Sequence, residues 1–177
     1  MSDPVRSYTA RDYINAFDLQ PHPEGGYFRE TYRCAETIAG SALPDRFQEN
    51  RSLCTSILFL LSAGEVSRFH RIKADEVWHF YCGCPLVLHL LEADGTHRRL
   101  CLGLDLAAGQ RPQALVPHNT WFGATPLERE GFSLTGCTTA PGFEFEDFEL
   151  ADRETLRKRF PRHEALINQL TVSARVK

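Results

Sequence analysis

The stretch Leu86-Val-Leu-His-Leu-Leu-Glu-Ala-Asp-Gly-Thr-His-Arg-Arg-Leu-Cys-Leu102 carries the clearest structural signal in the chain. Two largely apolar runs flank the dipeptide Asp94-Gly95. Asp-Gly between such runs is typical of a β-hairpin, because the tight turn that joins twisted antiparallel strands requires positive φ angles. The stretch therefore predicts two antiparallel strands joined by a short turn.

Short strand-like runs continue on both sides of this hairpin. They recur roughly every 8–12 residues between Gly, Pro and Asp-Gly turns, a spacing typical of a β-sandwich or barrel. No helical segment alternates with them, which excludes a doubly wound α/β fold and the dinucleotide or phosphate loops that depend on it. The predicted strands are Tyr27–Arg33, Leu53–Leu61, Val66–Ile72, Val77–Tyr81, Leu86–Glu92, His97–Leu102, Ala114–Pro117, Thr120–Ala124, Phe132–Thr138 and Glu144–Leu150.

Short helices are predicted near both ends of the chain. Thr9 is a suitable N-cap with Asp12 three residues later, and Asp152 can cap a helix near the C-terminus. Pro161 ends that helix, and His163–Leu170 can form another. The residues expected on the buried faces are Ile14, Phe17, Leu156 and Phe160.

Length and charge limit the class of protein. With 177 residues, the chain is expected to form a single domain, 1–177, with a β core over about 21–150 and a helical tail over 152–170. The 20 basic and 23 acidic residues give a net charge of −3. This balance argues against binding to nucleic acids or to anionic membranes.

The cysteines and the N-terminus indicate a reducing compartment. The 6 cysteines form no C-x-x-C pair, which argues against a zinc ribbon or a thioredoxin-like redox site. The N-terminal residues lack the charged and apolar pattern of a secretory signal. The longest apolar run, Ile57–Leu61, is too short to span a bilayer. We therefore expect a cytoplasmic protein with free thiols.

A cluster of ionisable side chains interrupts the apolar strands in the middle of the chain. Arg68 and His70 alternate on one strand and are expected to face the same side. His79 and Tyr81 share a face of the next predicted strand, which Glu76 precedes. An imidazole beside a carboxylate can transfer protons near neutral pH. The same atoms can also bind a divalent metal ion, and the spacing leaves both possibilities open.

Other polar and aromatic residues have simpler interpretations. Trp78, Phe80, Trp121 and Phe122 are expected to pack in the core or to line a pocket. The remaining histidines are interpreted as hydrogen-bonded structural residues, since an isolated histidine is a weak marker of a site. These are His22, His89, His97, His118 and His163.

Two stretches resemble the conserved motifs of the cupin superfamily. The first, Gly64-x5-His70-x-Ile72-x3-Glu76-x6-Gly83, has the spacing of the first motif, with Ile72 in place of its second histidine. The second runs from Gly109 through Pro117-His118-Asn119-Thr120-Trp121-Phe122 and has Phe122 at the position of the motif's histidine. With two metal-ligand positions apolar, we expect a cavity that binds metal weakly or not at all.

More specifically, four blocks resemble the cupin 5 subfamily, whose members are described as sugar-epimerase-like. This resemblance implies a jelly-roll β-barrel with an internal ligand cavity, and a homodimer. The strand Gly26-Tyr-Phe-Arg-Glu-Thr-Tyr32 is also similar to one in the deoxythymidine-diphospho-sugar 3,5-epimerases, where it helps to hold the nucleotide. The catalytic histidine of those enzymes lies on the strand that corresponds to that of His70 and acts without metal. The four blocks are His22–Tyr32, His70–His79, Val116–Trp121 and Gly136–Glu149.

The leading hypothesis is a small-molecule-binding cupin that epimerises or isomerises a sugar-like carbonyl compound. In this hypothesis His70 abstracts a proton, Glu76 or Asp75 supports its charge, and His79 and Tyr81 serve as acid or oxyanion donor. Arg68 suits an anionic substrate group. The residues expected to contact the ligand are Phe28, Glu30, Tyr32, Arg68, Tyr81, Trp121 and Phe122.

Two alternatives stay open at this point. His70, Glu76 and His79 could bind a single divalent metal ion in a metal-dependent cupin enzyme. The cavity could instead hold a metabolite without turning it over. A purely structural role is least favoured, because buried ionisable groups cost stability when they are idle. The sequence therefore predicts a small-molecule ligand, a homodimer, and either no cofactor or one metal ion.

Overall fold

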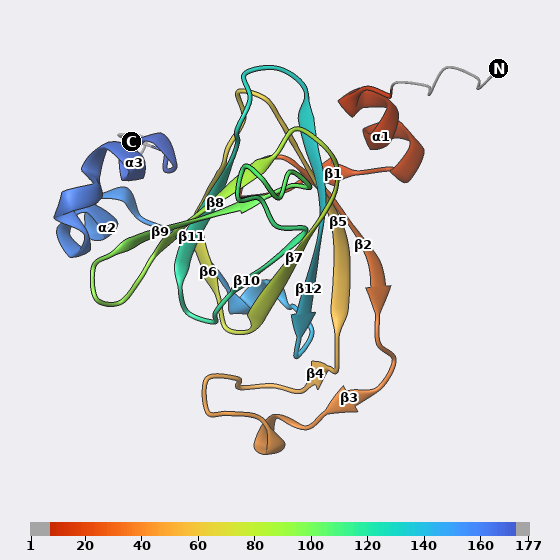
Figure 1. The fold of residues 1–177 in the computed structure, drawn as a ribbon. Helices are drawn as coiled ribbons and strands as arrows, with labels where there is room; N and C mark the ends of the chain where they lie inside the picture. Colours follow the sequence, from red (N-terminus) through yellow and green to blue (C-terminus); the bar gives the residue numbers. More distant parts are fainter. Residues whose placement is uncertain (1–7, 173–177) are drawn as a thin grey trace, which may run out of the picture.

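The computed structural model describes residues 8–172, which form two antiparallel β-sheets packed face to face, with short helices on either side (Figure 1). This arrangement confirms the predicted all-β jelly-roll architecture. The first sheet has the order β1 (Gln20–Pro21), β2 (Tyr27–Arg33), β5 (Thr55–Ser62), β12 (Phe132–Ala140), β7 (Asp75–Gly83) and β10 (Gln113–Val116). The second has the order β13 (Phe148–Leu150), β6 (Ser67–Ile72), β11 (Trp121–Pro126), β8 (Leu86–Leu91) and β9 (His97–Leu102).

The hairpin predicted from the Asp-Gly pair is confirmed. Strands β8 and β9 pair antiparallel from Leu86 opposite Leu102 to Leu91 opposite His97. Gly95 lies in the connecting turn with φ of 88°, in the left-handed region that an L side chain rarely adopts. The turn chemistry thus fixes the register of the strand pair.

The hydrophobic core lies between the two sheets. Strand β8 is buried on both faces, so its sequence is apolar at every position except His89 and does not alternate. Its residues Leu86, Leu88 and Leu90 meet Phe59 and Trp78 from the facing sheet. This packing holds the two sheets together and encloses the space in which the site lies.

The helices cover the outer faces of the sandwich. Helix α1 (Ala10–Phe17) begins at the predicted capping box of Thr9 and Asp12 and packs beside β5 and β12, away from the C-terminal helices (Figure 1). Phe17 is 44 % exposed, so its predicted burial is wrong. Helices α2 (Arg153–Arg159) and α3 (Glu164–Gln169) cover the second sheet, as expected for the tail. Within the described chain, none of the helices has the length and apolar character needed to cross a membrane.

Three segments differ from the strand prediction. Strand β7 begins at Asp75, so Glu76 lies within the strand and not before it. The predicted strand Glu144–Leu150 is instead the 3₁₀ turn η2 (Phe145–Asp147) followed by the short β13. The polar stretch before β5 contains the pair β3 (Thr37–Ile38) and β4 (Arg51–Ser52) and the turn η1 (Gly40–Ala42).

Candidate functional site

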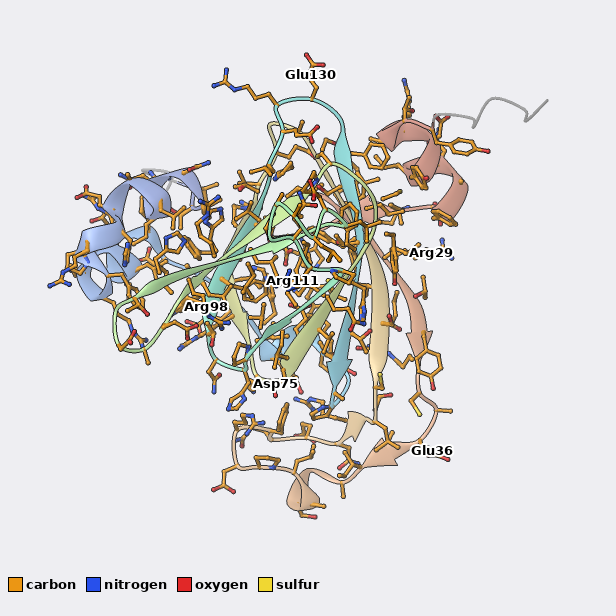
Figure 2. All side chains as sticks on the ribbon, in the orientation of Figure 1. Arg29, Glu36, Asp75, Arg98, Arg111 and Glu130 are labelled. Carbon is orange, nitrogen blue, oxygen red and sulfur yellow. The ribbon has the colours of Figure 1, made fainter. Side chains whose placement is uncertain are left out.

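A cavity of about 90 Å³ lies between the sheets at one end of the sandwich. Figure 2 shows Asp75, the first residue of β7, at the end of the sandwich that faces the β3–β4 segment. Ionisable groups and aromatic rings line the cavity together. The lining residues are His22, Glu24, Phe28, Glu30, Arg33, Thr55, Ile57, Phe59, His70, Ile72, Glu76, Trp78, Cys137, Thr139, Phe143, Glu144, Phe145 and Phe148.

Glu24 enters the cavity from the loop between β1 and β2. Gly25 has φ of 115°, and a Cβ there would lie 2.2 Å from the carbonyl oxygen of Val66, so glycine is required at this position. The carbonyl oxygen of Glu24 accepts hydrogen bonds from the backbone N–H and from Nε of Arg68. The glycine turn and the bonds to Arg68 together direct the Glu24 side chain inward.

Glu24 and His70 form a buried pair. Oε2 of Glu24 lies 3.2 Å from Nε2 of His70, and Oε1 accepts a hydrogen bond of 2.8 Å from the hydroxyl of Ser67. Nδ1 of His70 lies 2.7 Å from the carbonyl oxygen of Arg68 and so donates to it. Both ring nitrogens therefore face oxygen atoms, and a proton taken up by the pair would lie between Nε2 of His70 and Oε2 of Glu24.

Burial and charge act in opposite directions on this pair. Burial disfavours the imidazolium and lowers the pKa of His70 below its usual range, against the attraction of Glu24. Burial alone would raise the pKa of Glu24, but the charge of His70 and the hydrogen bonds from His22 and Ser67 outweigh it and lower this pKa. Glu24 is thus the group most readily ionised in the cavity.

His22 is the third member of this cluster. Its Nδ1 lies 3.2 Å from the backbone nitrogen of Glu24 and 3.2 Å from Oε2 of the same residue. A neutral Nδ1 accepts the backbone N–H, whereas a protonated Nδ1 donates to the carboxylate. His22 therefore gives Glu24 a second proton-bearing neighbour when it is charged.

Glu76 has the opposite protonation preference. Its Oε2 accepts a hydrogen bond of 2.9 Å from the indole N–H of Trp78. Burial, with the nearby negative charge of Glu24, raises the pKa of Glu76 to about 8. At neutral pH the cavity therefore contains a protonated carboxylic acid, Glu76, together with the ionised Glu24 that pairs with His70. Groups whose pKa values are moved apart in this way can act as acid and base in one reaction.

The described residues do not fit a cupin-type metal centre. Ile72 and Phe122 take the place of two ligands, and the ring of Phe122 packs 4.1 Å from that of His70, centroid to centroid. Both nitrogens of His70 already face oxygen atoms of the protein. Across residues 8–172, no group of three or more His, Cys, Asp or Glu side chains is arranged to hold a metal ion. We therefore derive no step through a metal at this site.

The mouth of the cavity is lined by the cover segment, residues 143–148, and by Arg33. The guanidinium of Arg33 binds Glu30 through Nε at 3.0 Å and Nη2 at 2.8 Å, and Glu144 through Nη1 at 2.5 Å. The rings of Phe143 and Phe145 pack 5.1 Å apart at the opening. The segment and Arg33 thus narrow the access to Glu24 and Glu76.

Buried charge anchors the far side of the cover segment. Arg51 is 1 % exposed and donates two hydrogen bonds of 2.8 Å to the carboxylate of Asp147. Lys73 lies 3.1 Å from the same carboxylate, and Arg51 also binds Glu146. Such a paired, bidentate arrangement fixes the orientation of the segment.

The structure brings His70 and Glu76 together but does not bring His79 to them. Within β7, Glu76 points into the cavity, while His79 faces outward and contacts Thr138 at 3.1 Å and Gln113 at 2.9 Å. Successive residues of a strand face opposite sides, so Glu76 and His79, which are three positions apart, point to opposite faces of the sheet. The predicted cluster of these three side chains is therefore wrong in its geometry.

A β-bulge overturns the predicted placement of Arg68. Arg68 and Phe69 together lie opposite Gly123, so the alternation of β6 is interrupted before His70. Arg68 donates to the carbonyl oxygens of Pro23 and Glu24 and does not line the cavity. It supports the loop that carries Glu24 instead of facing a substrate.

The predicted ligand-contacting residues divide into two groups. Phe28 and Glu30 line the cavity, and Phe122 packs directly against His70. Tyr32 and Tyr81 are 53 % and 48 % exposed and lie outside the cavity. Trp121 packs beneath the C-terminal helices, where Arg71 lies over its ring. Their chemical roles stay predictions, as does the homodimer.

Sequence reasoning missed Glu24, His22 and the cover segment. The sequence analysis interprets His22 as structural and does not name Glu24 as a site residue. The signal was the acidic residue directly before Gly25-Gly26, since paired glycines mark a close backbone approach that can direct a neighbouring side chain inward. The sequence does not show which strand that loop approaches.

Comparisons with known proteins agree with this architecture. Residues 11–151 match the family model Cupin_5, described as cupin superfamily (DUF985). The chain is 30 % identical over 145 residues to the uncharacterized protein YML079W of Saccharomyces cerevisiae, a match that covers 76 % of this chain and 71 % of that protein. Protein SO0799 of Shewanella oneidensis superposes with a TM-score of 0.86 and 42 % identity, over 95 % of this chain and 100 % of that one.

A more distant likeness extends to an enzyme. Oxalate decarboxylase of Bacillus subtilis superposes with a TM-score of 0.53 and 16 % identity, over 88 % of this chain and 38 % of that one. At this identity the likeness concerns the fold alone, because one fold supports many activities.

Proposed function

The chain belongs to the Cupin_5 family of the cupin superfamily, and from the chemistry of its cavity we propose that it is a proton-transfer isomerase or epimerase of a small carbonyl compound. One observation carries this proposal. A protonated Glu76 and the ionised Glu24, which pairs with His70, line the same cavity. An acid and a base can thus act on the same small molecule when it is bound in the cavity.

The proposed reaction assigns the base to the pair and not to His70 alone. Both nitrogens of His70 face oxygen atoms, whereas the Glu24 carboxylate lines the cavity. Glu24 takes a proton from the carbon next to the carbonyl, and the C–H electron pair becomes the C=C bond of an enol. Glu76 supplies a proton to the carbonyl oxygen, and His70 is a positioning residue that stabilises the charge of Glu24.

The reverse transfer completes the reaction. Protonated Glu24 returns its proton to carbon, and an enol O–H returns a proton to the Glu76 carboxylate. For an epimer, the O–H on the original carbonyl carbon is deprotonated and Glu24 protonates the other face of the same α-carbon. For an isomer, the hydroxyl on the α-carbon is deprotonated and becomes the new carbonyl, while Glu24 protonates the former carbonyl carbon.

Solvent deuterium exchange tests this proposal. The protein is incubated in D₂O with a panel of hydroxy-aldehydes and hydroxy-ketones, and C–H loss is followed by proton NMR. We expect exchange by the native protein, and a rate at least about 100-fold lower for Glu24→Gln and Glu76→Gln. Glu149→Gln is the matched control, because Glu149 pairs with Arg71 outside the cavity. Exchange no faster than in Glu24→Gln, across the panel, would contradict the proposal and favour a non-catalytic binding protein.

A further inference from the structure

Acidic side chains outnumber permanently basic ones around the cavity. Among the described residues that line it, four are glutamates and one, Arg33, has a permanent positive charge. Four of the five N–H donors of Arg33 are engaged by Glu30, Glu144 and the carbonyl oxygen of Phe143, and two carboxylates neutralise its charge. An anionic group that enters the cavity would therefore meet carboxylates before it met a free cation.

The neighbouring cations do not change this balance. Arg51 and Lys73 bind Asp147 behind the cover segment, and Arg68 binds backbone carbonyls of the loop that carries Glu24. None of the three lines the cavity. Burying an anion without a partner is costly, because desolvation is not repaid by an opposite charge.

The size of the cavity sets a second limit. A dry cavity of roughly 150 Å³ accommodates benzene. The cavity here measures about 90 Å³, so it suits a smaller molecule, of on the order of four to six non-hydrogen atoms. The apolar rings of Phe28, Phe59 and Phe148 can contact its C–H groups, and Thr55 and Thr139 lie on the same lining.

From charge and size together, and resting on the proposed function, we propose that the substrate is an uncharged hydroxy-carbonyl compound of about triose size. Phosphorylated and nucleotide-linked sugars are excluded by the same two features. The carboxylates of Glu30 and Glu144 act as specificity determinants, because they neutralise the one guanidinium that an anionic substrate could use. Arg33 thereby bridges Glu30 and Glu144 at the mouth of the cavity and does not bind a phosphate.

Matched pairs of ligands test this inference by binding alone. Dihydroxyacetone and glyceraldehyde are compared with their monophosphates by saturation-transfer NMR and by titration calorimetry of the native protein. We expect binding of the uncharged members and affinities about 10-fold or more lower for the phosphates. A phosphate that binds as tightly as its uncharged partner, or a panel in which no uncharged member binds, would overturn the inference.

A double variant tests the cause of the selectivity. Glu30→Gln with Glu144→Gln releases Arg33, so the phosphates are expected to gain affinity by about 10-fold while the uncharged members change little. Glu149→Gln, which lies outside the cavity, is expected to alter neither series. The double variant is checked first for a native-like melting curve. If the variant does not fold, the ligand comparison on the native protein decides the inference. Uncharged ligands that bind without deuterium exchange would contradict the proposed function and leave this inference intact.

Discussion

Nε2 of His70 lies 3.2 Å from Oε2 of Glu24, and Nδ1 of the same ring lies 2.7 Å from a backbone carbonyl oxygen. The imidazole is therefore held at both nitrogens by the protein. In the proposed reaction, the role of base therefore passes from His70, where the sequence analysis placed it, to the Glu24 carboxylate that pairs with it. It also explains how a barrel with two apolar residues at cupin metal-ligand positions can still contain acid–base chemistry.

The buried acid predicts an unusual pH dependence of stability. The pKa of Glu76 is raised from 4.5 to about 8 in the folded protein, so the native state binds more protons than the unfolded state between these values. Stability therefore falls as the pH rises from about 4.5 to about 8, by on the order of 4–5 kcal/mol from this group. Urea unfolding as a function of pH measures the slope.

Glu76→Gln is the matched variant for this prediction. Glutamine retains the shape of the protonated acid but does not titrate, so the variant is expected to lose this part of the slope and to exceed the native protein in stability above about pH 8. Parallel stability curves for the two proteins over this range would show that Glu76 ionises normally.

Gly25→Ala tests the turn that carries Glu24. A Cβ there would clash with the carbonyl oxygen of Val66, and the φ of 115° is unfavourable for alanine. We expect a loss of unfolding free energy of about 3 kcal/mol or more, together with displacement of Glu24. Gly64→Ala is the control, because its φ of 84° is also positive but nothing lies within 4 Å of the added atom. Its expected cost is about 1–2 kcal/mol, and equal losses in both variants would refute the steric account.

Arg51→Ala tests the anchor of the cover segment. The variant leaves Asp147 buried without its bidentate partner, which is expected to cost about 3–5 kcal/mol of unfolding free energy. Arg71→Ala breaks an exposed pair with Glu149 and is expected to cost about 1 kcal/mol or less. Hydrogen exchange over residues 143–148 should accelerate only in the first variant. Unchanged protection there would mean that Arg51 does not anchor the segment.

Phe145→Ala tests access to the cavity. The ring of Phe145 is 53 % exposed, and its removal opens the mouth with little loss of buried surface. Trp78 lines the cavity, so its fluorescence in a Trp121→Phe background reports the entry of acrylamide. We expect a several-fold increase in the quenching constant of the variant. Equal quenching with and without Phe145 would show that another route leads to the cavity.

The sequence was informative where local chemistry decides structure. The Asp-Gly turn, the Thr9 capping box and the strand periodicity each follow from short-range rules, and each is confirmed. The presence of His70 and Glu76 at one site was also accessible, because both lie on consecutive strands of the chain within one motif. These features need no knowledge of the distant parts of the chain.

The remainder of the site depends on long-range contacts. Glu24 meets His70 only because the β1–β2 loop packs against β6, and no local pattern specifies that contact. A single bulge before His70 removes Arg68 from the cavity, and the extension of β7 separates Glu76 from His79. Because side chains alternate along a strand, each one-residue irregularity reverses the faces that periodicity predicts.

The central claim is that Glu76 stays protonated at neutral pH while Glu24, which pairs with His70, is ionised in the same cavity. Infrared difference spectra between the native protein and Glu76→Gln, recorded as a function of pH, test it most directly. The account predicts a carboxylic acid C=O band at pH 7 that belongs to Glu76 and disappears with a midpoint near pH 8. A spectrum in which Glu76 contributes only carboxylate bands at pH 7 would contradict the account.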